Sequence, residues 1–187
     1  MTALTSLYSS ITQRLEQLDW LIPTLARFVF AAVLLVYFLN SGMTKLGDGF
    51  AGLWTPSTGA YAQIFPKAFE AVGYDSDALS MFHTLVVVAG TWAEFILPAL
   101  IVLGLLTRLA ALGMIGFVVV QSLTDIFGHG QDSALGAWFD RFPDAAILDQ
   151  RAFWVFLLLV LVVKGAGPLS FDRALKPRVE RPDLALK

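Results

Sequence analysis

A single carboxylate, Glu94, stands in the middle of a long apolar stretch of the chain. It lies fifteen residues after Leu79 and twelve before Leu106, so a helix over residues 79–106 would carry it near its midpoint. An ionisable group at that depth in a membrane is costly, and it is expected to have both a partner and a function. Glu94 is therefore the first candidate for chemistry, either ionised beside a cation or protonated and neutral.

Arg27 is the cation that the spacing favours as the partner of Glu94. Trp20 marks the expected start of the first apolar segment, and Arg27 would lie about 10 Å beyond it at 1.5 Å per helical residue. A guanidinium at that depth needs a counterion. We therefore predict a buried structural ion pair between Arg27 and Glu94.

Further polar residues fall on the expected membrane segments, in the half of the membrane opposite to Arg27. His83 precedes Glu94 by eleven residues, or three helical turns, and so shares its face. The expected boundary of a ligand site is formed by Lys45, His83, Glu94, Gln121 and Asp125. Lys45, His83 and Gln121 can donate hydrogen bonds, while Glu94 and Asp125 can carry protons.

Two interpretations of this polar set remain open. An apolar cavity with a few polar groups suits a quinone headgroup or another polar-tipped lipophile. Alternatively, the side chains hydrogen-bond one another between helices and serve packing alone. No metal site is predicted, since the only imidazoles are His83 and His129 and the second lies between two glycines.

Several classes of chemistry are excluded or unsupported. The chain has no cysteine, which excludes disulfides, thiolate-bound metals and iron–sulfur clusters. None of the common motifs for a nucleophilic serine, a zinc protease or a phosphate loop is present. No residue is assigned a catalytic role, and no covalent cofactor is expected.

The composition identifies the solvent of these segments as lipid. Of the 187 residues, 57% are hydrophobic and 15% are charged, against about 45–50% and 25% in soluble domains. We predict an all-α integral membrane four-helix bundle in one domain, residues 1–187, with spans at about 20–45, 79–106, 109–127 and 152–163 and a cytoplasmic tail at 164–187. A net charge of −2 gives no reason to expect nucleic acid.

The segment before the first span is expected to stay on the protein. It lacks the basic region and cleavage site of a signal peptide. Leucine and isoleucine recur at spacings of three and four from Leu4 to Leu18, the pattern of an amphipathic helix lying on the membrane surface.

Basic residues near the span ends set the expected orientation. With the N-terminus inside, nine lie on the cytoplasmic side: Arg14, Arg27, Arg108, Lys164, Arg173, Lys176, Arg178, Arg181 and Lys187. Four remain outside: Lys45, Lys67, Arg141 and Arg151. The positive-inside rule therefore predicts that both termini are cytoplasmic.

The two outer connections, residues 46–78 and 128–150, are long, aromatic and acidic. Aromatic segments between spans usually lie at the headgroup level. They could also form a lid or a docking surface for a protein partner over the outer end of the bundle.

Four motifs in order resemble the DoxX family. They are Arg27-Phe28, the run from Asn40 to Leu46 (NSGMTKL), Glu94-Phe95 with GLLTR at 104–108, and GAGPLSFD at 165–172. Arg27, Lys45, Glu94, Arg108 and Asp172 occupy the matching positions. The resemblance covers about residues 27–175 and implies a four-helix protein of a bacterial or archaeal cytoplasmic membrane.

The resemblance also implies a function, because the namesake members are subunits of a thiosulfate:quinone oxidoreductase. We expect a membrane subunit of a quinone-linked redox system in the bacterial inner membrane, possessing a lipophilic ligand site in the outer half of the bundle. The alternative is a non-catalytic membrane anchor or assembly partner, as part of an oligomer or complex. The long acidic, aromatic connection at residues 128–150 departs from compact family members. The resemblance therefore does not identify a substrate for this protein.

Overall fold

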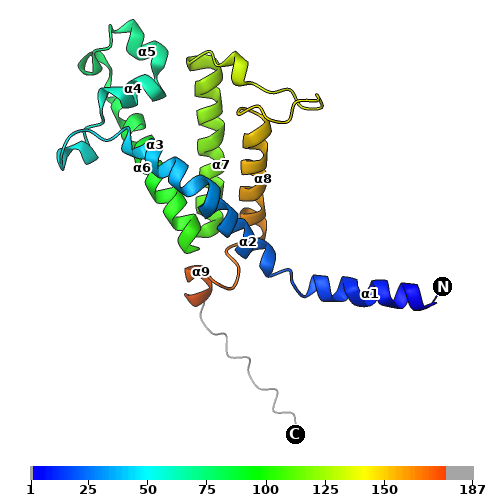
Figure 1. Cartoon of the computed structure of the whole chain (residues 1–187). Helices are drawn as coiled ribbons and strands as arrows, with labels where there is room; N and C mark the ends of the chain where they lie inside the picture. Colours follow the sequence, from blue (N-terminus) through cyan, green and yellow to red (C-terminus); the bar gives the residue numbers. More distant parts are fainter. Residues whose placement is uncertain (1, 176–187) are drawn as a thin grey trace.

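The structure is a computed structural model that describes residues 2–175 (Figure 1). Those residues are helical apart from turns and loops, and they contain no strand beyond an isolated bridge between Leu135 and Ile147. The predicted all-α class is confirmed. Residues 176–187, the second half of the expected cytoplasmic tail, lie outside the described part.

Within residues 2–175, three helices are long and apolar enough to cross a membrane. The first, Leu21–Met43, consists of α2 (Leu21–Phe30), a π-helical segment η1 (Ala31–Leu35) and α3 (Val36–Met43). The second is α6 (Met81–Leu103), and the third, Thr107–Gly128, combines α7 (Thr107–Leu123) with the π-helical segment η4 (Thr124–Gly128). Their 23, 23 and 22 residues extend over about 33–35 Å at 1.5 Å per residue, which is enough to cross a hydrocarbon core of about 30 Å.

A fourth helix, α8 (Asp149–Lys164), lies beside α7 where the fourth span was predicted (Figure 1). Its 16 residues reach about 24 Å, somewhat less than the hydrocarbon thickness. That this helix crosses the bilayer therefore stays a prediction. It contributes Leu158 and Leu161 to the core that it shares with the three longer helices.

One apolar core joins these helices. Its buried members include Phe30, Leu34 and Phe38 from the first helix, Ile101 from α6, and Met114 from α7. The rings of Phe117 and Trp154 approach Phe38 edge-on, with centroids 5.9 and 6.3 Å away. The shared core fixes the relative positions of the helices that carry the polar residues.

The segment at 46–78 is more structured than the predicted loop. It folds into η2 (Ala51–Leu53), α4 (Thr58–Ile64), α5 (Pro66–Ala71) and η3 (Ser76–Ala78). The hydroxyl of Ser57 accepts from Ala60 N and so caps α4, and Pro66 begins α5, where a missing N–H costs nothing. Tyr61 and Phe69 pack with Val87 of α6 in a small second core. These helices cover one end of the bundle, called the loop end below.

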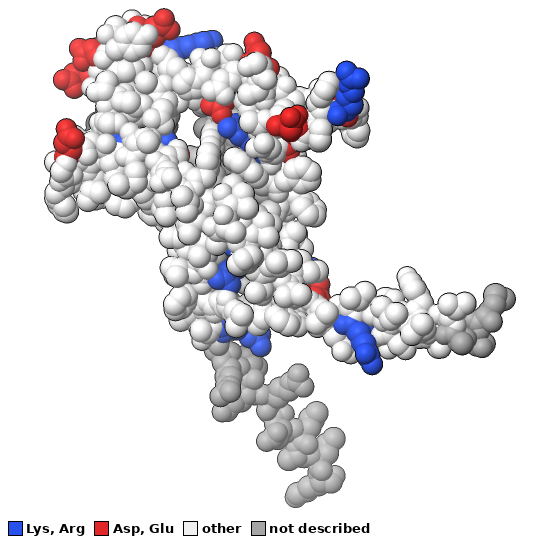
Figure 2. All heavy atoms as spheres, in the orientation of Figure 1, with Lys and Arg blue, Asp and Glu red and all other residues white. Residues whose placement is uncertain are grey.

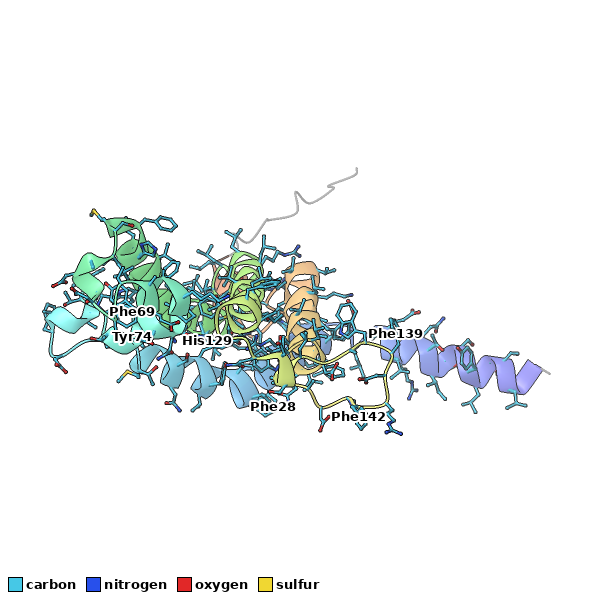
Figure 3. All side chains as sticks on the ribbon, turned by 90° about the horizontal axis from the view of Figure 1, so that it is seen from above. Phe28, Phe69, Tyr74, His129, Phe139 and Phe142 are labelled. Atoms are coloured by element: carbon cyan, nitrogen blue, oxygen red, sulfur yellow. The ribbon has the colours of Figure 1, made fainter. Side chains whose placement is uncertain are left out.

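The second connection, residues 128–150, is mostly irregular. It contains one short turn of helix, η5 (Asp132–Ala134), and exposes Trp138, Phe139 and Phe142. Phe139 and Phe142 lie on the part of this loop that projects away from the helices (Figure 3).

Both ends of the described chain lie at the opposite end of the bundle, called the terminal end. There α1 (Thr2–Glu16) extends sideways from the bundle, and α9 (Phe171–Ala174) closes the described part (Figure 1). Leu4, Leu7, Ile11 and Leu15 are exposed on α1. The predicted helix is present, and its placement on the membrane surface stays a prediction.

Candidate functional site

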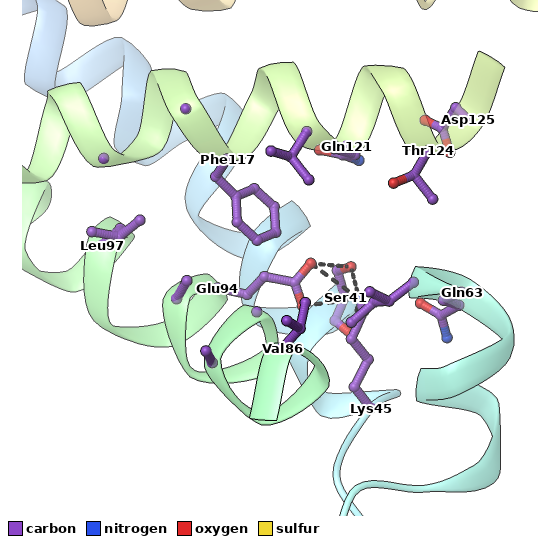
Figure 4. Close-up of a pocket in the computed structure, with 17 residues that line it drawn as sticks. Ser41, Lys45, Gln63, Val86, Glu94, Leu97, Phe117, Gln121, Thr124 and Asp125 are labelled. Atoms are coloured by element: carbon purple, nitrogen blue, oxygen red, sulfur yellow. Dashed lines mark hydrogen bonds and ion pairs between the residues drawn. The ribbon is translucent and has the colours of Figure 1, made fainter. Parts of the chain in front are cut away.

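The centre of the site is a buried ion pair between Lys45 and Glu94 (Figure 4). The ammonium of Lys45 donates to both carboxylate oxygens of Glu94, at 3.0 and 2.9 Å. It also lies 2.7 Å from the hydroxyl of Ser41, which in turn donates to Glu94 Oε1 at 2.8 Å. Because the two charged side chains are only 6% and 3% exposed, this network is shielded from screening by water.

Local sequence brings these three groups together. Ser41 and Lys45 are one helical turn apart at the end of α3, so they present neighbouring polar groups to α6. Gly42 lies between them, and a Cβ there would stand 2.7 Å from the ring of Phe95. The absence of a side chain at Gly42 therefore permits the close approach of α3 to α6 that the pair needs.

A cavity of about 450 Å³ opens beside the pair, bounded by α6, α7 and α4. Its walls are largely apolar or small, with Ile64, Leu97 and Phe117 as the largest apolar side chains. Gln121 and Asp125 face Lys45 and Glu94 across it from the α7 side (Figure 4). The cavity runs from near the middle of the bundle to the loop end, where Gln63 and Thr124 line it.

A second buried ion pair adjoins the cavity at the loop end. Arg151 at the start of α8 donates to Asp125 Oδ2 at 2.5 Å and to the hydroxyl of Ser122 at 3.0 Å. Arg151 is buried, whereas sequence reasoning assigned it only to the outer surface. Its position directly before an apolar run was the available signal, since a basic residue at a helix start is unfavourable unless it is paired.

Gln121 completes the polar lining. Its amide nitrogen donates to the hydroxyl of Tyr37 at 2.8 Å. Its amide oxygen is buried and has no partner among the described residues, an arrangement that leaves an acceptor unsatisfied in the wall of the cavity.

His83 is the one predicted lining residue that lies apart from the cavity. Its Nδ1 is 2.8 Å from the hydroxyl of Ser80, and its ring meets that of Phe65 edge-on at 4.7 Å. His83 and Glu94 are three helical turns apart on α6, but the α4–α5 segment covers the part of α6 that carries His83. His83 packs on that cover instead of facing the ligand space.

The predicted pair of Arg27 with Glu94 is wrong. Arg27 lies at the terminal end, where its guanidinium donates to the carbonyl oxygens of Ile101 at 3.0 Å and of Val102. It also donates to Ala166 O at 3.1 Å and to Leu169 O. The carbonyls at a helix C-terminus lack intrahelical partners and attract cations, so backbone carbonyl oxygens, and not Glu94, accept the hydrogen bonds of Arg27.

Asp172 makes the matching contact with the start of α7. Its carboxylate accepts from Leu106 N at 2.7 Å and from Thr107 N at 2.9 Å. These N–H groups would otherwise be unsatisfied at a helix N-terminus. Arg27 and Asp172 thus hold the turn between α6 and α7, while Lys45 and Glu94 form the site.

Removal of this cap should cost stability without touching the site. We expect Asp172→Ala to lower the free energy of unfolding by about 1–2 kcal/mol, as loss of a helix cap does. Unfolding in mixed micelles measures it, with Asp132→Ala in the exposed loop as the control. Equal stability of the two variants would contradict the capping role.

The described residues contain no group of three or more histidines, cysteines or acidic residues placed to hold a metal ion. His83 and His129 lie on separate elements, and His129 Nε2 is 3.0 Å from the carbonyl oxygen of Gln63.

These features define an all-helical membrane protein with a buried Lys–Glu pair beside an apolar cavity. The DoxX family model matches residues 22–125, 104 of the 187 residues, and covers the first three helices and the site. The chain belongs to the DoxX family. No curated protein and no solved structure matched it.

Proposed function

We propose that this protein binds a neutral, polar-tipped lipophile, of the quinone class, as the membrane subunit of a quinone-linked redox system. The observation that carries the proposal is the apolar cavity that ends on the Ser41, Lys45 and Glu94 network. Its volume of about 450 Å³ lies within the range of small-molecule sites, and its few convergent polar groups are typical of them.

The charge balance favours a neutral ligand. Glu94 is paired with Lys45, and Asp125 is paired with Arg151, so the two carboxylates in the lining are both compensated. A charged ligand would enter a low-dielectric space without a free counterion, which is costly. A quinone headgroup carries no net charge.

The same groups suit proton transfer to a bound quinone. Reduction of a quinone to a quinol takes two electrons and two protons. In this proposal Glu94 and Asp125 relay the protons, and an external reductant, held by a partner protein, supplies the electrons. The isoprenoid tail would leave past the small residues of α6 and α7, such as Gly90 and Gly116.

The test is the lipid content of the purified protein. Protein extracted in mild detergent should retain about one quinone per chain, detected by mass spectrometry of a solvent extract. Its absence, together with stable co-purification of a soluble enzyme, would instead support the anchor function.

The anchor function has its own supporting observation. Trp138, Phe139 and Phe142 stand exposed on the loop after α7, and an aromatic surface is typical of interfaces. If this loop holds a partner, Trp138→Ser should abolish co-purification and leave quinone retention unchanged.

We further propose that both termini are cytoplasmic in a bacterial inner membrane. Basic side chains gather near the terminal end, whereas acidic ones dominate the loop end (Figure 2), as the positive-inside rule requires for this orientation. A reporter fused after Lys187 should be active only if it functions in the cytoplasm. Activity of a periplasmic reporter at that position would contradict this orientation.

A further inference from the structure

A second cavity, of about 600 Å³, lies at the terminal end, far along the bundle from the first. It is bounded by the linker before α2, the start of α7, the end of α8 and the turn before α9. Two of the motifs that mark the family resemblance meet here, at Arg108 and at Gly165. Neither the proposed ligand nor its site involves this cavity.

The lining carries more positive than negative side chains. The cations are Arg108, Lys164 and Arg173, and the acids are Asp19 and Asp172, so three minus two leaves one positive charge. Lys164 is already paired with Asp19 at 2.8 Å. Within residues 2–175, the guanidinium groups of Arg108 and Arg173 form no ion pair.

Arg108 lies beside the turn that follows α8. Gly165 has a φ of +81°, and a Cβ built there would lie 3.4 Å from Nε of Arg108. The glycine lets the chain adopt this positive-φ conformation and turn after α8, and the guanidinium of Arg108 lies close to it. Arg108 lines the cavity, and its side chain is exposed.

The rim of this cavity is apolar. Trp20, Leu106 and Leu109 line it and are exposed. They stand at the ends of two membrane-spanning helices, where the headgroups of a bilayer meet its hydrocarbon. A ligand here would contact cationic groups and apolar surface side by side. A free anion would make no use of the apolar surface.

We infer that this cavity binds the phosphodiester headgroup of an anionic phospholipid. Arg108 and Arg173 contact the phosphate, for which guanidinium groups are well suited, and the acyl chains lie along Leu106 and Leu109. The single excess positive charge matches a lipid such as phosphatidylglycerol, which carries one negative charge, better than a zwitterionic lipid. Basic sites at membrane helix ends bind anionic lipids in this manner.

The experiment titrates the full-length protein in phosphatidylcholine nanodiscs with phosphatidylglycerol and follows the melting temperature. Phosphatidylglycerol should raise it in a saturable manner. Arg108→Gln and Arg173→Gln should each weaken the apparent affinity about fivefold, since one basic group near a membrane contributes about a factor of this size. Arg14→Gln, which removes an exposed cation on α1 outside the cavity, should change it little.

Three outcomes would overturn the inference. They are equal stabilisation by phosphatidylcholine, an equal loss of affinity in Arg14→Gln, and equal stabilisation by inorganic phosphate, which would identify a free anion as the ligand. The melting temperature in phosphatidylcholine alone reports whether each variant folds. If Arg108→Gln does not fold, the result is decided by comparing the apparent affinity of Arg173→Gln with that of Arg14→Gln.

Discussion

Lys45→Met is expected to destabilise the protein by about 3–5 kcal/mol, the typical loss when one partner of a buried ion pair is removed. The substitution nearly keeps the side-chain length but leaves the carboxylate of Glu94 with the hydroxyl of Ser41 as its remaining hydrogen-bond partner among the described residues. Glu94 would then lie buried and uncompensated, at 3% exposure of its side chain. Unfolding in mixed micelles measures the change.

The double variant Lys45→Met with Glu94→Leu separates a broken pair from a damaged core. Replacement of both charges by apolar groups is often neutral for stability, so the double variant should recover at least half of the loss. Lys67→Met, at an exposed position of α5, should have little effect. A double variant as unstable as the sum of its single variants would show that Lys45 and Glu94 contribute independently.

Gly116→Leu is expected to weaken ligand binding strongly while the protein stays folded. Gly116 lines the cavity, and no heavy atom lies within 4 Å of a Cβ built there. A leucine can therefore enter the ligand space without a clash, and it is also favoured over glycine in a helix, by somewhat less than the about 0.8–1 kcal/mol that separates alanine from glycine. Overlap with the ligand should weaken binding of a short-chain quinone about tenfold or more.

The matched control for this variant is Val119→Leu, on the same helix but at an exposed position outside the cavity lining. Binding measured by quenching of tryptophan fluorescence should be unchanged there. Unaltered binding in Gly116→Leu would place the ligand elsewhere.

Sequence patterns predicted the helical framework well because the apolar runs are long and their length is set by the bilayer. The helices at Leu21–Met43, Met81–Leu103 and Thr107–Gly128 begin and end within a few residues of the predicted spans. The π-helical segments at Ala31–Leu35 and Thr124–Gly128 could not be predicted, because a π-helix has no compositional signature comparable to an apolar run.

The centre of the site was only half predicted. Glu94 was recognised from its depth, but depth does not say which side of α6 faces which helix. The close packing of Gly42 against Phe95 brings α3 and Lys45 to Glu94. Arg27 was misassigned because only carboxylates were considered as its partners, whereas carbonyl oxygens at the end of α6 satisfy it.

Burial produced by distant segments also escaped sequence reasoning. The packing of His83 against Phe65 depends on how residues 46–78 fold back over α6. The burial of Arg151 depends on the contact between α8 and α7. Neither contact leaves a periodic signal along the chain, since each joins residues far apart in sequence.

The central claim is that the cavity beside Lys45 and Glu94 holds a lipophile with a polar ring. The most direct test is an experimental density map of the protein extracted from its native membrane. We expect ring-shaped density between Glu94 and Gln121, with a polar atom of the ligand within hydrogen-bonding distance of at least one of them and a tail that reaches the lipid. A cavity filled by protein side chains, or one that holds only an acyl chain with no ring near Glu94, would contradict the claim.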